Sequence, residues 1–110
     1  MWFTVQMLFK SFKELEENED TDTYEESIIL IKAETKDVAV LIAEKKGKEA
    51  EIAYKNLCSE EVKWKFIKVV DVYEIIDETI ESGTEVFSRF ILVPQKTELK
   101  DVLNRYYQEE

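Results

Sequence analysis

Alternating apolar and polar residues predict a strand at the start of the chain. Residues 2–12 place four apolar side chains on one side of an extended backbone: Phe3, Val5, Met7 and Phe9. This period of two is typical of a strand with one buried face. A second strand is expected over Tyr24 to Ala33, where an aliphatic run from Ile28 to Ile31 predicts burial on both faces.

The period changes after Glu34, and apolar residues then recur at steps of three and four. This spacing predicts one long helix over about residues 35–57, with Thr35 as its N-cap. Gly47 lies inside it, and a glycine there costs about 1 kcal/mol relative to alanine. We therefore expect either a break at Gly47 or a close approach of the helix to the sheet.

The second half of the chain predicts a hairpin followed by a helix. Residues 62–76 and 84–93 form two apolar strands around the turn residues Ser82 and Gly83. The halves of the first of these strands favour opposite faces, so a bulge is expected near Lys68. Thr97 is expected to cap a helix over about residues 97–108, which carries an apolar stripe.

The predicted order is β-β-α-β-β-α, an α+β fold with a mostly antiparallel four-stranded sheet, in a single domain over residues 1–110. One long helix covers only one sheet face. The other face then needs the short C-terminal helix or a second molecule, so a homodimer is one expectation.

Composition excludes most catalytic chemistry. The 110 residues include no histidine and a single cysteine, so no Ser-His-Asp or Cys-His relay, no Cys/His zinc site and no internal disulfide is available. No cofactor is expected. Cys58 has no neighbouring base and is interpreted as a small packing residue.

Charge and hydropathy indicate the cellular location of the protein. The N-terminal segment lacks the features of a signal peptide, and no apolar run approaches the ~18 residues of a membrane span. The lone Cys58 fits a reducing compartment, so a cytoplasmic location is expected. A net charge of -10 opposes binding to nucleic acid or to an anionic membrane.

An acidic segment over residues 13–23 is the densest charge in the chain. It lacks the glycine of an EF-hand loop, so a calcium site is the weakest of three interpretations. The others are a solvated loop, which is favoured, and a partner-binding loop.

Two further charged groups have an ordinary structural interpretation. Carboxylates recur from Asp71 to Glu85, and a pair of them could do acid-base chemistry, but no oxyanion-hole or phosphate-loop motif accompanies them. Lys63, Lys65 and Lys68 lie around Trp64 and Phe66, a pattern found in single-strand nucleic-acid platforms. We expect instead that the aromatic rings enter the core while the lysines protect a strand edge.

Several segments together resemble a family of short bacterial and phage proteins known only as a domain of unknown function. The resemblance covers about residues 2–93 and lies in these segments: Trp2-Phe3-Thr4-Val5, residues 24–33 with Glu25-Glu26, Trp64-Lys65-Phe66 followed by Asp71 to Ile75, and Gly83-Thr84-Glu85-Val86. It implies a bacterial or phage cytosolic origin and one compact α+β domain. It implies no activity and no catalytic residue.

The favoured function is a small acidic non-catalytic module that binds a basic protein, in the manner of an immunity protein, antitoxin or phage-encoded inhibitor. The alternatives are a structural homo-oligomeric subunit and, with less support, a carboxylate-dependent enzyme. The residues expected to contact a partner are acidic or apolar: Glu16, Glu17, Glu19, Asp20, Asp22, Glu78, Glu81, Glu85, Phe87 and Ile91.

Overall fold

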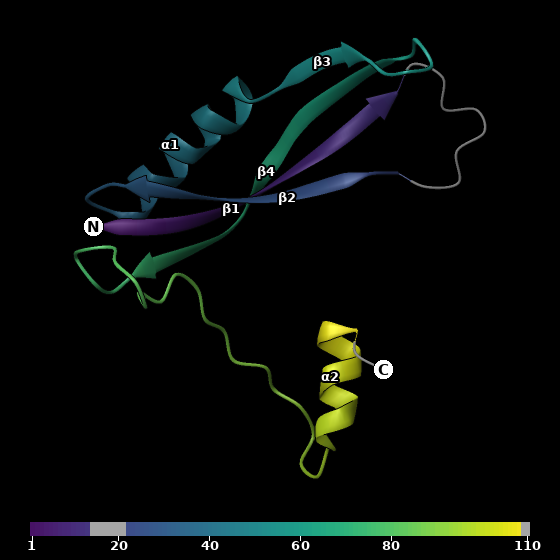
Figure 1. The fold of residues 1–110 in the computed structure, drawn as a ribbon. Coiled ribbons are helices and arrows are strands. Elements are labelled where there is room, and N and C mark those ends of the chain that lie inside the picture. The colour runs from purple at the N-terminus through teal and green to yellow at the C-terminus, as the bar shows by residue number, and fades with distance from the viewer. Residues whose placement is uncertain (14–21, 109–110) are drawn as a thin grey trace.

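The computed structural model describes residues 1–13 and 22–108 and contains one antiparallel sheet and two helices (Figure 1). The elements follow in the order β1 (Trp2–Lys13), β2 (Tyr24–Lys32), α1 (Lys36–Glu49), β3 (Ile52–Lys55), β4 (Glu61–Ile75) and α2 (Leu99–Tyr107). The strands lie in the order β2-β1-β4-β3. The α+β class and the element order β-β-α-β-β-α are confirmed, although one strand is not the one expected.

Strand β1 forms the centre of the core because both of its edges are paired, with β2 on one side and β4 on the other. Its alternation behaves as predicted, since Phe3, Val5, Met7 and Phe9 are buried on the side that α1 covers. We name this side the helix face. The opposite side, which carries Thr4, Gln6, Leu8 and Lys10 of β1, is the open face.

Helix α1 begins where the sequence predicts. The Thr35 hydroxyl accepts a hydrogen bond from the Val38 backbone N–H at 3.2 Å, as an N-cap does. Ala39, Ala43 and Gly47 face the sheet and are buried. These small residues bring the helix axis close to the strands, which confirms the close approach expected at Gly47.

The predicted helix over residues 35–57 is too long. Helix α1 ends at Glu49, and residues 52–55 form the edge strand β3 instead. Ile52 lies opposite Trp64 and Tyr54 lies opposite Val62, so the alternation of these residues matches the exposed edge of β4. Backbone pairing with β4 overrides the helical spacing because apolar residues two apart also fit a strand.

The predicted strand over residues 84–93 and its hairpin are wrong. This segment has no strand pairing, and its first residues cross the open face, where the Thr4 hydroxyl donates to the Val86 carbonyl at 2.9 Å. The connection over residues 76–83 is longer than the two to five residues of most hairpin loops. It redirects the chain over the sheet instead of along its edge.

Strand β2 was expected to be covered on both faces, and this is also wrong. Ile31 is buried and Ile29 packs against the core, but Ile28 and Leu30 on the open face are 59% and 48% exposed. The reason is that α1 covers only the helix face. The aliphatic run therefore leaves half of its side chains accessible.

Strand β4 contains the irregularity that was expected near Lys68. Its register against β1 shifts twice, between Gln6 and Met7 and between Leu8 and Phe9, so that Val70 and Ile67 have no direct partner. These two bulges flank Lys68. They let both halves of the strand direct apolar side chains at the core.

Helix α2 lies apart from the sheet and contacts none of the other described helices and strands (Figure 1). Its N-cap is Glu98 without a side-chain cap, so the expected capping by Thr97 is wrong. The Thr97 hydroxyl instead donates to the Pro94 carbonyl in the preceding turn, at 2.5 Å. We name residues 89–107 the arm.

Candidate functional site

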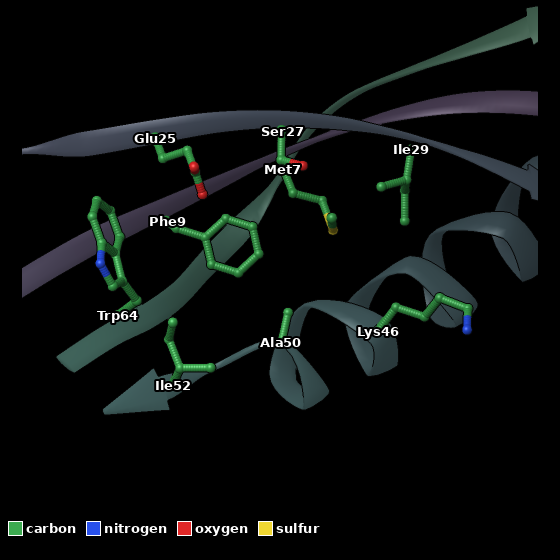
Figure 2. A pocket seen from close by; sticks show the side chains of 9 residues that line it. All are labelled: Met7, Phe9, Glu25, Ser27, Ile29, Lys46, Ala50, Ile52 and Trp64. Atoms are coloured by element: carbon green, nitrogen blue, oxygen red, sulfur yellow. The ribbon is translucent and has the colours of Figure 1, made fainter. Parts of the chain in front are cut away.

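A groove of about 450 Å³ opens on the helix face, beyond the C-terminal end of α1. Figure 2 shows the side chains that line it, which come from all four strands and from the end of α1. They are Met7, Phe9, Glu25, Ser27, Ile29, Lys46, Ala50, Ile52 and Trp64. The groove exists because α1 ends at Glu49, so the helix does not cover the far half of the sheet.

The floor of the groove is apolar. Met7 and Phe9 are buried, and the Phe9 ring meets the Phe66 ring edge-on with centroids 5.7 Å apart. Trp64 forms one wall, and its indole N–H donates to the Tyr54 hydroxyl at 3.3 Å.

Glu51 holds the junction between α1 and β3. Its carboxylate accepts a hydrogen bond from the Phe66 backbone N–H at 2.9 Å and lies 3.9 Å from the Lys65 ammonium. The Glu51 side chain thereby accepts from a backbone N–H on the edge of β4, next to the pair formed by Ile52, the first residue of β3, and Trp64. This contact ties the residue before β3 to the edge of β4.

The polar rim carries one carboxylate, one hydroxyl and one ammonium group, from Glu25, Ser27 and Lys46. An apolar floor with a few polar groups at its edge is the usual chemistry of a recognition site.

The acidic residues expected to bind a partner do not form one site. Glu16, Glu17, Glu19 and Asp20 lie outside the described residues. Asp22 is exposed at one end of the sheet, 3.7 Å from the Lys10 ammonium. Glu78, Glu81 and Glu85 lie at the other end, after β4.

Glu85 belongs to a small polar cluster at that second end. Its carboxylate accepts a hydrogen bond from the Tyr73 hydroxyl at 2.8 Å, and the Ser88 hydroxyl lies 3.3 Å from the same tyrosine oxygen. Hydrogen bonds from Ser88 and from Tyr73 lower the pKa of the Glu85 carboxyl. The Glu85 carboxylate thereby ties the segment after β4 to Tyr73 of the sheet.

The two apolar residues expected at an interface differ in their surroundings. The Phe87 ring packs against the Tyr73 ring with centroids 5.8 Å apart and is 43% exposed. Ile91 is half-buried in the arm, where Phe90 and Leu92 on either side of it are almost fully exposed.

Lysines gather on the open face at the end far from Glu85. Lys10 lies opposite Lys65, Phe12 opposite Lys63, and Leu8 opposite Lys68. Trp64 and Phe66 point to the helix face, which confirms the expected separation of aromatic rings from lysines. The expected strand edge is wrong at Lys63, because β4 pairs there with β3 as well as with β1. Lys10 was not included in this group by sequence reasoning because it lies on a different strand.

Cys58 does not pack in the core as expected but is exposed in the turn between β3 and β4. Its backbone N–H donates to the Asn56 side chain, which also accepts from Glu60. Residues 1–13 and 22–108 contain no group of three or more acidic or cysteine side chains arranged to hold a metal. Over the same residues, no helix is long and apolar enough to cross a membrane.

Sequence reasoning missed the groove because it placed residues 50–57 in a helix. The available signal was the alternation of Ile52, Ala53 and Tyr54, which fits a strand as well as a helix.

No curated protein and no solved structure is significantly similar to this chain. The sequence profile of one family matches residues 2–88, which include the sheet, α1 and the segment that crosses the open face but not the arm. The chain therefore belongs to the DUF4288 family, a domain of unknown function.

Proposed function

We propose that this protein is a non-catalytic module that binds another protein, and that an apolar segment of the partner occupies the groove beside α1. The groove itself supports the proposal. Met7 and Phe9 form its floor, Trp64 forms one wall, and its volume of about 450 Å³ falls within the range of ligand sites. Such a protein acts by occupancy, as an inhibitor or immunity-type protein does.

The charge of the chain favours a basic partner. At a net charge of -10, long-range attraction speeds the encounter with a positively charged surface. Lys46 and Glu25 at the rim would then fix orientation, while the apolar floor supplies most of the contact area. Binding of this kind weakens with added salt mainly through a slower association rate.

The test is site-specific photo-crosslinking. A photoreactive residue in place of Ile52 lies at the groove, whereas one in place of Leu41 lies on the outer side of α1, where the side chain is 65% exposed. Both variants are exposed to an extract of the source cells, and the crosslinked residue of the partner is mapped by mass spectrometry. We expect an apolar residue of a basic protein to be captured from position 52 and not from position 41.

The captured protein is then purified and titrated with the wild type and with Ile52→Asp. We expect Ile52→Asp to weaken binding at least about tenfold, because a carboxylate in the groove loses its hydration when the partner binds. Leu41→Asp is the control for added charge and leaves the affinity unchanged. Equal binding by the wild type and Ile52→Asp would reject the groove as the site.

A second function, that of a homo-oligomeric structural subunit, is favoured by a separate observation, the uncovered apolar side chains of the open face.

A further inference from the structure

Strand β2 forms one outer edge of the sheet. It pairs with β1 and with no other described strand, since the strand order is β2-β1-β4-β3. Its register against β1 is regular from Tyr24 to Lys32, without a bulge, and the strand contains no proline. Natural edge strands are usually short, or are interrupted by bulges or prolines, because a long regular edge pairs with other strands. The edge of β2 is therefore open to pairing.

The other free edges of the described sheet are shorter or irregular. Strand β3 has only four residues. Strand β4 extends beyond β3, but its register against β1 shifts twice in that part. The Phe66 N–H at the start of this stretch already donates to Glu51. Among the described residues, β2 offers the longest regular edge.

The backbone groups on this edge belong to the even-numbered residues of β2. The Ala33 N–H donates to the Met1 carbonyl and the Ser11 N–H donates to the Thr23 carbonyl, both at 3.0 Å, so odd-numbered residues direct their backbone groups at β1. Successive residues of a strand direct these groups to opposite edges. The residues whose N–H and C=O groups point outward, without a hydrogen-bond partner in the described chain, are Tyr24, Glu26, Ile28, Leu30 and Lys32.

Two-fold symmetry limits how two such edges can pair. In an antiparallel pair of identical strands within one sheet, the two-fold axis is normal to the sheet, so the helix faces of both copies lie on the same side. Directly opposed residues point to the same face of the sheet. An even-numbered residue of β2 therefore lies opposite an even-numbered residue of the partner.

The sequence of β2 is self-complementary in one of these registers. With the axis at Ile29, Glu26 lies opposite the partner's Lys32, and Ile28 lies opposite the partner's Leu30. The symmetry repeats both pairs on the other side of the axis. A shift of the axis by one residue in either direction separates Glu26 from the partner's Lys32. The charges of β2 thus favour a second copy of the same strand, in this register.

The side chains of these pairs are accessible. Ile28 and Leu30 are 59% and 48% exposed on the open face. The Lys32 ammonium lies 5.7 Å from the centre of the Trp2 ring, and the Glu26 carboxylate accepts a hydrogen bond from the Gln6 amide. Neither charged group forms an ion pair with a described residue. Opposite charges and aliphatic side chains placed directly across an antiparallel pair stabilise it.

We infer that two copies of this chain join along β2 into one continuous sheet, with the two-fold axis at Ile29. The outward backbone groups of each β2 pair with those of the other, and Glu26 forms an ion pair with the partner's Lys32. Both grooves then open on the same side of the joined sheet. The inference goes beyond the proposed binding of another protein and does not depend on it.

Sedimentation velocity of the full chain over a dilution series measures the mass directly. The buffer contains about 0.15 M salt, which limits the repulsion between two chains of net charge -10. We expect twice the 13.0 kDa of the chain. A mass of one chain up to the highest soluble concentration would overturn the inference.

A disulfide tests the register. In a Cys58→Ser background, Ile29→Cys places two thiols opposite each other at the axis, where the Cα atoms of a non-hydrogen-bonded pair are about 4.5 Å apart, within disulfide range. Ser27→Cys, on the same face, places the two thiols about 13 Å apart along the strands and is the control. On mild oxidation we expect a covalent dimer of Ile29→Cys and a single chain for Ser27→Cys. A yield from folded Ile29→Cys no higher than that from Ser27→Cys would overturn the inference.

Charge reversal tests the ion pair. Glu26→Lys and Lys32→Glu each place like charges opposite each other twice, so each variant should dimerise at least about tenfold more weakly. The double variant exchanges the two charges at an unchanged net charge and should regain the affinity of the wild type. Lys45→Glu and Glu49→Lys on α1 are the controls for net charge and should leave the affinity unchanged.

Circular dichroism and thermal melting confirm folding of every variant. The inference fails if the folded single variants at positions 26 and 32 dimerise as the wild type does, or if the folded double variant dimerises no better than they do.

Discussion

Gly47 of α1 lies directly against the ring of Phe66 in β4, so closely that a Cβ atom at residue 47 would be 2.4 Å from Phe66 Cδ1. Real Cβ atoms do not approach other heavy atoms this closely. The missing side chain therefore sets the distance between α1 and the sheet, and with it the position of the Phe66 ring against Phe9 in the core.

The first prediction concerns this contact. Gly47→Ala should lower the free energy of unfolding by about 1–3 kcal/mol, because the overpacking cost exceeds the gain in helix propensity. Urea denaturation followed by circular dichroism measures the change. Lys45→Ala on the exposed side of the same helix is the control and should shift stability by less than about 0.5 kcal/mol. Increased stability in Gly47→Ala would show that the Phe66 ring moves aside freely.

The second prediction concerns Glu51. Glu51→Ala removes the acceptor for the part-buried N–H of Phe66 and should cost about 1–3 kcal/mol of unfolding free energy. Glu51→Gln keeps an acceptor oxygen and should retain most of that stability, since the ion pair with Lys65 is exposed and contributes little. Equal losses in the two variants would mean that charge, and not the hydrogen bond, holds the junction.

The third prediction concerns pH. Hydrogen bonds from Ser88 and Tyr73 lower the pKa of Glu85 below its ordinary value of 4.5. The unfolded chain then binds this proton more readily than the folded one, so the contribution to stability is present above pH 4.5 and is lost as pH falls through the lowered pKa. An NMR titration of the carboxyl carbon should show the lowered pKa in the wild type and a higher one in Tyr73→Phe. An unchanged pKa in Tyr73→Phe would contradict the contribution assigned to the Tyr73 hydroxyl.

The fourth prediction concerns Cys58, which is exposed in the turn before β4. A thiol reagent should modify it fully without denaturant, and the melting temperature should stay within about 1–2 °C of that of the unmodified protein, because this thiol does not pack in the core. The reaction is followed by the absorbance of the coloured thiolate that the reagent releases. A Cys58→Ser variant controls for non-specific colour, and slow modification would indicate that the turn is covered in solution.

Local pattern by itself determined much of this protein. The alternation from Phe3 to Phe9 predicted which side of β1 is buried, because side chains of a strand alternate whatever lies around it. Thr35 and Gly47 were interpreted correctly for a similar reason, since an N-cap and a close approach depend on a few neighbouring atoms. The α+β class and the element order followed from these elements.

Tertiary structure alone decided what the backbone of two segments does and which side chains of a third segment are exposed. Residues 52–55 join the sheet because β4 offers a free edge there, and residues 84–93 do not join it because the chain after Ile75 crosses the open face. In β2, the exposure of Ile28 depends on what covers that face. The spacing of apolar residues shows which side chains can be buried. Which strands pair and which sheet face is covered depend on residues distant in the sequence. The groove could therefore be seen only in the folded chain.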